Sequence, residues 1–162
     1  KQTVFEAINN SGIDFDDMVE LELNYNKTIE VNFDEKMTKI RAEKVKRVQN
    51  YIPEIKTEFA ESGDLLVIGW GGTYGALKTA TSILRGEGLN VSHAHLRYIS
   101  PFPSNLGEIL KGFKTVVVPE LNNGQLVKII RDKYFVDAKG YNKMMGVPIT
   151  KQELTDAINQ YL

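Results

Sequence analysis

Apolar and polar positions follow two different patterns along the chain. Between residues 19 and 33 they alternate, as in half-buried strands, and residues 26–28 separate the two alternating runs. The apolar positions of both runs are odd-numbered, so a three-residue loop would place them on one face of a β-hairpin. A helix with Asp34 as its cap is predicted over residues 34–50. We expect residues 1–62 to form a connector that contains this hairpin and this helix.

From residue 63 onward, short apolar runs alternate with segments of helical periodicity. The pattern predicts strands at residues 65–68, 91–99 and 115–118 and an edge strand at Val147-Pro148. It predicts helices over residues 73–88, after a cap at Asn105, over residues 125–134, and after the capping box of Thr150 and Glu153. Alternating strands and helices are typical of a parallel sheet with helices on both faces. Residues 63–162 are therefore predicted to form a three-layer, doubly wound, mainly parallel α/β domain, with residues 65–68 and 115–118 as central strands.

Composition narrows the class of protein. A chain of 162 residues that is 42% hydrophobic can bury one domain-sized core. The net charge of −1 gives no overall attraction to nucleic acid or to an anionic membrane. The sequence contains no cysteine, so this chain offers no thiolate for an iron–sulfur cluster. Neither a bilayer-spanning apolar run nor a secretory signal over residues 1–10 is visible, and we expect a cytoplasmic protein.

A glycine-rich turn follows the first predicted strand. Its candidate residues are Gly69, Gly71, Gly72, Thr73, Tyr74 and Gly75. Such a turn exposes backbone N–H groups at a helix amino terminus, where an anion can bind. The spacing G-x-G-x-x-x-G and the lack of an acidic residue after the second strand argue against a dinucleotide site. The alternative is that these glycines only allow close helix–strand packing or positive φ angles.

A second polar turn follows the third predicted strand. Its candidates are Glu120, Asn122, Gly124 and Gln125. Turns after parallel strands open at the carboxyl edge of a sheet, so both turns should border one cleft. In the alternative interpretation, Asn122 or Asn123 caps the next helix and Glu120 is a favourable charge beside its amino terminus.

Other polar side chains give weaker indications. His93 and His95 lie two apart on a predicted strand, as metal ligands can, but no third ligand is visible and we predict no metal site. Arg97, Tyr98 and Arg131 could bind an anion or pair across a subunit boundary. Side chains of these types are more often solvated or salt-bridged surface residues.

Five ordered segments together resemble one enzyme family, the α subunits of 2-oxoacid:ferredoxin oxidoreductases. They are Arg41-Ala-Glu-Lys-Val45, Gly69-Trp-Gly-Gly-Thr-Tyr-Gly75, Tyr98-Ile-Ser-Pro-Phe-Pro103, Pro119-Glu-Leu-Asn122 with Gly124-Gln-Leu126, and Asn142-Lys-Met-Met-Gly-Val-Pro148. The resemblance covers residues 34–162. The sequence departs from it at Gly72, where many relatives carry serine, and at Asn123, where they carry an apolar residue.

The resemblance implies a domain similar to the carboxy-terminal domain of transketolase, in a complex that decarboxylates 2-oxoglutarate oxidatively to an acyl-CoA. Thiamine diphosphate, magnesium, an iron–sulfur cluster and CoA are implied for the complex, with no cofactor in this chain. A thiamine-binding β subunit and ferredoxin are the implied partners, in an oligomer. The thiamine motif Gly-Asp-Gly is absent, and its nearest match, Gly63-Asp-Leu65, fails at the third position. We therefore expect a non-catalytic organising and interface domain that is inactive alone.

Two alternatives remain open at this stage. The chain could be a stand-alone anion-binding or nucleotide-binding module that uses the turn at residues 69–75. It could also belong to a transketolase-like enzyme of another reaction class, because a shared fold does not fix function.

Overall fold

The computed structural model describes residues 35–161, and the predicted hairpin and the Asp34 cap lie outside this range. The chain divides into two compact units at Arg47 and Val48. A helix runs over residues 35–48, so its last residue belongs to the second unit, and Glu35 and Lys39 form an ion pair one turn apart on it. None of the helices in the described part is both long enough and apolar enough to cross a membrane.

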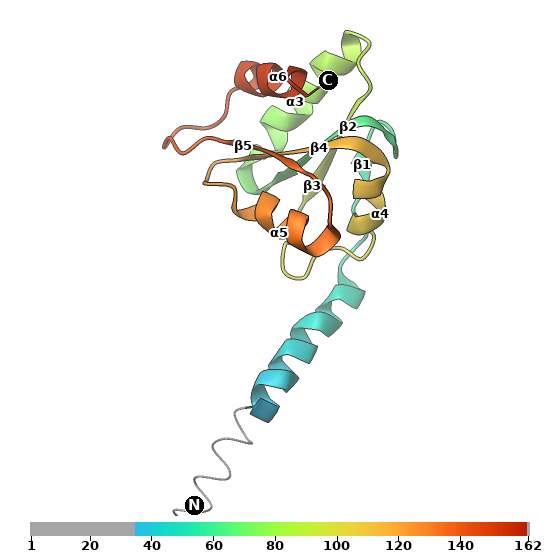
Figure 1. Cartoon of the computed structure of the whole chain (residues 1–162), viewed down its shortest axis with the longest axis vertical. Coiled ribbons are helices and arrows are strands. Elements are labelled where there is room, and N and C mark those ends of the chain that lie inside the picture. The colour runs from blue at the N-terminus through green and yellow to red at the C-terminus, as the bar shows by residue number, and fades with distance from the viewer. Residues whose placement is uncertain (1–34, 162) are drawn as a thin grey trace, which may run out of the picture. The chain divides into compact units, whose positions relative to one another are not determined.

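The second unit contains a five-stranded sheet in the order β1-β3-β2-β4-β5 (Figure 1). Its strands are β1 (Thr57–Glu58), β2 (Gly63–Trp70), β3 (Val91–Leu96), β4 (Phe113–Glu120) and β5 (Lys139–Asn142). β2 pairs in parallel with both β3 and β4, β4 pairs in parallel with β5, and β1 alone is antiparallel to its neighbour. The predicted mainly parallel sheet, with residues 65–68 and 115–118 on adjacent strands, is confirmed.

Helices cover both faces of this sheet, as predicted (Figure 1). Helices α3 (Tyr74–Gly86) and α6 (Lys151–Asn159) lie on one face, and α4 (Leu106–Lys111) and α5 (Gln125–Tyr134) lie on the other. Side chains of β2 alternate between the two cores. Leu65 and Val67 pack with α3 and α6, whereas Leu66 and Ile68 pack with α4 and α5. A strand buried on both faces must be apolar at every position, which explains the continuous run in the sequence.

The last edge strand differs from its prediction. Val147-Pro148 is not a strand, and Val147 is largely exposed. The edge strand is β5, which pairs with β4 through contacts such as Val118 with Gly140. Its sequence, Lys-Gly-Tyr-Asn, carries no apolar signal because a partly exposed edge strand needs none. The second predicted strand is also shorter than expected, since β3 ends at Leu96.

The antiparallel strand β1 was not predicted, and Asn105 explains how the chain enters it. Asn105 occupies the N-cap position of α4, yet its side chain makes no capping hydrogen bond, so the predicted cap is wrong. Its amide instead accepts from the backbone N–H of Ile55 at 3.0 Å and donates to the Ile55 carbonyl at 2.8 Å. An amide side chain can do both because it carries a donor and an acceptor. The segment before β1 is thereby held on the sheet domain.

Candidate functional site

The carboxyl edge of the sheet brings the two predicted turns to the same side. The 3-10 turn η2 (Gly71–Thr73) directly follows β2, and residues 121–124 follow β4, its parallel neighbour. The loops after β3 and β5 leave the sheet at this edge as well. We call the loops at residues 97–100, 121–124 and 143–147, together with η2, the carboxyl rim.

Two glycines of the first turn are required by the fold. A Cβ atom on Gly69 would lie 2.2 Å from Cδ1 of Leu77, and Gly71 has a φ of +59°. A Cβ atom on Gly72 or Gly75 would meet nothing within 4 Å. Thr73 is occupied inside the turn, because its hydroxyl donates to the Trp70 carbonyl at 2.8 Å. Close packing and positive φ therefore account for Gly69 and Gly71, but the fold does not require Gly72 or Gly75.

Polar groups of the second turn bind the start of α5. Glu120 is fully buried, and its two carboxylate oxygens accept from the backbone N–H groups of Leu126 at 2.8 Å and Val127 at 3.0 Å. Asn122 accepts from the backbone N–H of Gln125 at 3.0 Å. Gly124 has a φ of +69°, which a side chain would strain. This geometry is a capping network of the kind that the sequence offered as the alternative to a ligand cleft.

The two remaining candidates, Arg131 and Tyr98, lie in different parts of the fold. Arg131 is in the last turn of α5, the end remote from Gln125, and its Nε donates to the Ala138 carbonyl at 2.7 Å. Tyr98 is on the loop after β3 and is about half exposed. The structure thus brings the two turns and Tyr98 to the carboxyl rim, whereas Arg131 supports the approach to β5.

The two histidines face α3 in a small aromatic cluster. His93 is fully buried, neither of its ring nitrogens has a hydrogen-bond partner, and burial lowers its pKa to about 4. Burial also lowers the pKa of His95, opposed by a hydrogen bond to the Gly71 backbone. The Tyr74 ring lies 5.7 Å from the His93 ring and 5.1 Å from the His95 ring, between centroids. No group of three or more metal-ligating side chains occurs within residues 35–161.

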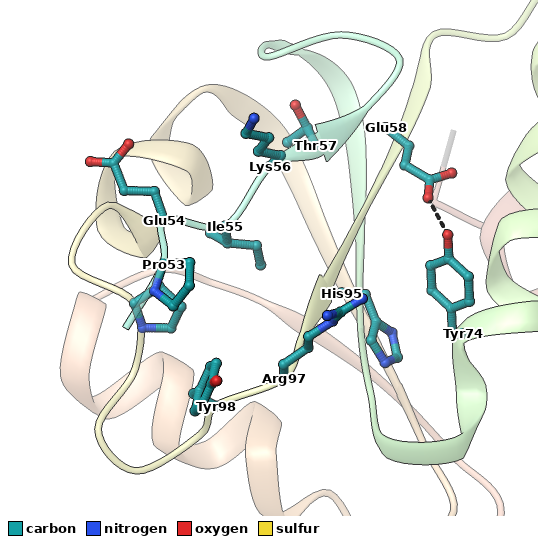
Figure 2. A pocket seen from close by; sticks show the side chains of 11 residues that line it. Pro53, Glu54, Ile55, Lys56, Thr57, Glu58, Tyr74, His95, Arg97 and Tyr98 are labelled. Carbon is teal, nitrogen blue, oxygen red and sulfur yellow. Dashed lines mark hydrogen bonds between the residues drawn. The ribbon is translucent and has the colours of Figure 1, made fainter. Parts of the chain in front are cut away.

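A pocket of about 590 Å³ lies beside this cluster (Figure 2). Its walls are residues 53–58, Tyr74, His95, Arg97, Tyr98 and Pro103. At one end, the Tyr74 hydroxyl donates to Glu58 at 2.7 Å, and Lys78 donates to both residues. Sequence reasoning missed this pocket because one wall is the segment that leads into β1, a strand of two residues without a visible pattern.

Sequence comparison places the chain among ferredoxin-linked oxidoreductase subunits. It is 42% identical over 120 residues to 2-oxoglutarate oxidoreductase subunit KorA of Mycobacterium tuberculosis, covering 73% of this chain and 18% of that protein. It is 35% identical over 105 residues to ketoisovalerate oxidoreductase subunit VorA of Pyrococcus horikoshii, covering 64% of this chain and 26% of that protein. The chain therefore spans less than a third of the length of these curated relatives.

Solved structures give the same fold. A 2-oxoglutarate:ferredoxin oxidoreductase from Magnetococcus marinus, solved with 2-oxoglutarate, coenzyme A and succinyl-CoA bound, matches with a TM-score of 0.73 and 27% identity. The match covers 79% of this chain and 23% of that one. A split-gene transketolase in an inactive β4 tetramer matches with a TM-score of 0.51 and 16% identity over 66% of this chain and 41% of that one, which shows the fold alone.

The family model of pyruvate:ferredoxin oxidoreductase core domain II matches residues 63–154, which is more than half of the chain. This match spans the sheet from β2 to β5 and both turns of the carboxyl rim. It agrees with the resemblance carried by the five sequence motifs. The chain therefore belongs to the core domain II family of the 2-oxoacid:ferredoxin oxidoreductases, as part of an α subunit.

Proposed function

We propose that this chain is the organising domain of a 2-oxoglutarate:ferredoxin oxidoreductase, and that its carboxyl rim docks on the thiamine-binding β subunit. The complete enzyme would oxidise 2-oxoglutarate to succinyl-CoA and CO₂ and pass the electrons to ferredoxin. Thiamine diphosphate, magnesium, an iron–sulfur cluster and CoA would be held elsewhere in the complex. The choice of 2-oxoglutarate is supported by the similarity to KorA and to the Magnetococcus enzyme.

Exposed apolar side chains on the carboxyl rim carry this proposal. Met144, Met145 and Val147 on the loop after β5 are exposed by 71%, 67% and 52%, and Leu121 after β4 is exposed by 44%. Large apolar side chains that gather on a surface mark interaction sites, and the flexible methionine side chain adapts to a partner. These four residues leave the sheet from two neighbouring strands, so one partner can cover them together.

The polar groups at the same edge support a structural role. Glu120, Asn122 and Thr73 each bond to neighbouring backbone, which leaves their polar atoms engaged within the domain. A group that acts on a substrate must be able to reach it, and Glu120 is fully buried. The rim is therefore better suited to bind a partner than to perform chemistry.

Co-purification tests the interface. The double variant Leu121→Glu with Met145→Glu, co-expressed with the β subunit of the same enzyme, should leave the melting temperature of the chain unchanged and abolish its recovery with the β subunit. The matched control is Ile83→Glu on the outer face of α3, which is similarly exposed at 39% and should assemble normally. Normal assembly of the double variant would contradict the proposed interface.

Activity assays test the role and the substrate separately. The chain alone should not reduce ferredoxin or viologen with any 2-oxoacid. The assembled enzyme should have a higher kcat/KM for 2-oxoglutarate than for 2-oxoisovalerate, the substrate type suggested by the VorA relatives. Activity of the isolated chain would refute the organising role, whereas a preference for 2-oxoisovalerate would refute only the substrate.

A further inference from the structure

The pocket beside β1 arises because β1 and β3 separate. The two strands pair at Glu58 with His93 and at Thr57 with Ala94. Continued pairing in this register would place Glu54 opposite Arg97. Pairing stops instead at Thr57, because the Asn105 side chain takes both backbone groups of Ile55. Figure 2 shows residues 53–56 on one side of the resulting pocket and His95 and Arg97 on the other.

Burial fixes the walls of this pocket in place. Ile55 is 8% exposed and packs in the core with Leu96 and Phe102. Gln49 donates to the Phe102 carbonyl at 2.9 Å, which ties the start of the unit to the loop after β3. Core packing and the side-chain hydrogen bonds of Gln49 and Asn105 therefore hold residues 53–56 apart from the end of β3. The pocket does not depend on a mobile loop.

Two acidic and two basic side chains line the pocket, and one of the acidic ones already has a partner. Glu58 is engaged by Tyr74 and Lys78. Within the described part of the chain, Glu54, Lys56 and Arg97 form no ion pair, so two cations face one anion. The Arg97 charge also acts on the neighbouring His95, where it adds to burial in lowering the imidazole pKa. The guanidinium is therefore the strongest anchor for an anion in this pocket.

We propose that the pocket receives an extended protein segment that carries a carboxylate side chain, which pairs with the guanidinium of Arg97. The backbone of the segment would lie between residues 53–56 and the end of β3. Edges of extended chain without a strand partner are where peptides add by backbone hydrogen bonding. Within the described residues, the end of β3 beyond Ala94 is such an edge on the side of β1, because the Asn105 side chain occupies the Ile55 backbone groups that would otherwise pair with it.

The origin of the segment rests on the proposed function. Because the chain spans 18% of KorA and 23% of the Magnetococcus subunit, most of such an enzyme lies outside it and can supply the segment. The chemical preference of the pocket does not rest on that function, so it can be measured on the chain alone.

The test uses ¹⁵N-labelled chain and two blocked peptides, acetyl-Thr-Val-Glu-Val-Thr-amide and its counterpart with lysine in place of glutamate. The acidic peptide should shift the backbone amides of residues 54–57 and 95–98 and bind at least about tenfold more tightly than the basic one. The variant Arg97→Gln should weaken the acidic peptide by about tenfold. The control Lys111→Gln removes an exposed cation on α4 and should bind as the original chain does.

Succinate and inorganic phosphate, titrated separately, distinguish a protein segment from a small anion. Binding of either at the same amides as tightly as the acidic peptide would overturn the proposal and indicate a metabolite site. Absence of amide shifts, or equal binding of the two peptides, would overturn it as well. Arg97→Lys keeps the charge but loses the two-pronged donor and should bind with intermediate affinity, so the result does not depend on one variant.

Discussion

Glu120 at the end of β4 holds the amino terminus of α5 by accepting the backbone N–H of Leu126 at 2.8 Å, with no exposure to solvent. The second carboxylate oxygen accepts from the backbone N–H of the next residue, Val127, at 3.0 Å. Replacing Glu120 by alanine would leave buried donors without a partner. We expect this variant to lose at least about 2 kcal/mol of unfolding free energy, measured by urea denaturation.

Glu120→Lys separates this capping role from an interface role. A lysine cannot accept either hydrogen bond and adds a positive charge beside the positive end of the helix. The expected result is a lower melting temperature, with normal β-subunit assembly of the fraction that remains folded. A stable variant that fails to assemble would show instead that Glu120 acts at the interface. Glu108→Gln, at an exposed site in the first turn of α4, is the control and should change stability by less than about 0.5 kcal/mol.

Gly69 and Gly75 should respond differently to the same substitution. In Gly69→Ala the new methyl group would fall 2.2 Å from Leu77, which is fully buried, and we expect a loss of about 1–3 kcal/mol. In Gly75→Ala the methyl group meets nothing within 4 Å, and Gly75 is inside α3, so stability should rise by about 0.5–1 kcal/mol. Chemical denaturation of both variants measures the two changes in unfolding free energy. Equal changes would contradict the conclusion that close packing requires a glycine at position 69 but not at position 75.

The sequence predicted those parts of the fold whose reasons are local. β2 and β4 were visible because strands buried on both faces are apolar throughout. The capping box was visible because Thr150 and Glu153 bond across three residues of one helix start. The parallel order then placed both turns at one edge.

The parts that were missed depend on contacts between distant residues. β1 has two residues and is positioned by the amide of Asn105, fifty residues from Ile55. No local pattern distinguishes an asparagine that caps a helix from one that binds a remote strand. The pocket follows from this contact and could not be predicted without it. For Glu120, the sequence allowed both a helix-capping role and a ligand-binding role. Its complete burial and its hydrogen bond to the start of α5 favour the capping role, and neither can be read from the sequence.

His93 should make stability depend on pH between about 4 and 6.5. Its pKa is lowered to about 4 in the folded chain, from 6.5, because burial disfavours the charged imidazole. The unfolded chain therefore binds the proton more readily, and stability falls as the pH falls from 6.5 toward 4, by up to about 3 kcal/mol. The lowered pKa of His95 acts in the same direction. Denaturation curves at several pH values measure the slope.

His93→Leu provides the control for this pH dependence. The substitution removes two buried nitrogens that have no partner, so it should raise stability at pH 7 by about 1–3 kcal/mol. It should also flatten the slope between pH 4 and 6.5, leaving the smaller part due to His95. An unchanged slope would mean that His93 does not set it.

Lys143 should control both the loop after β5 and the ionisation of Glu153. Its ammonium group donates to both carboxylate oxygens of Glu153 at 2.9 Å and to the Pro148 carbonyl at 3.0 Å, and its side chain is only 9% exposed. These contacts close the loop that presents Met144 and Met145. The Lys143 hydrogen bond is also the main reason that the pKa of Glu153 is lowered to about 2, with Thr150 as the next contributor.

Replacing Lys143 by methionine tests this arrangement, because the side chain keeps an apolar stem and loses the charge. The pKa of Glu153, followed by NMR titration of its carboxyl carbon, should rise toward 4.5 while remaining below it through the Thr150 contacts. In the original chain the contribution of Glu153 to stability is present above its unfolded pKa and lost as the pH falls toward 2, so the variant should lose it at higher pH.

Since the loop after β5 is no longer tied to α6 in Lys143→Met, recovery with the β subunit should also fall. Lys151→Met, at an exposed position beside the same capping box, should change neither measurement. A Glu153 pKa that stays near 2 in Lys143→Met would show that the capping box alone sets it.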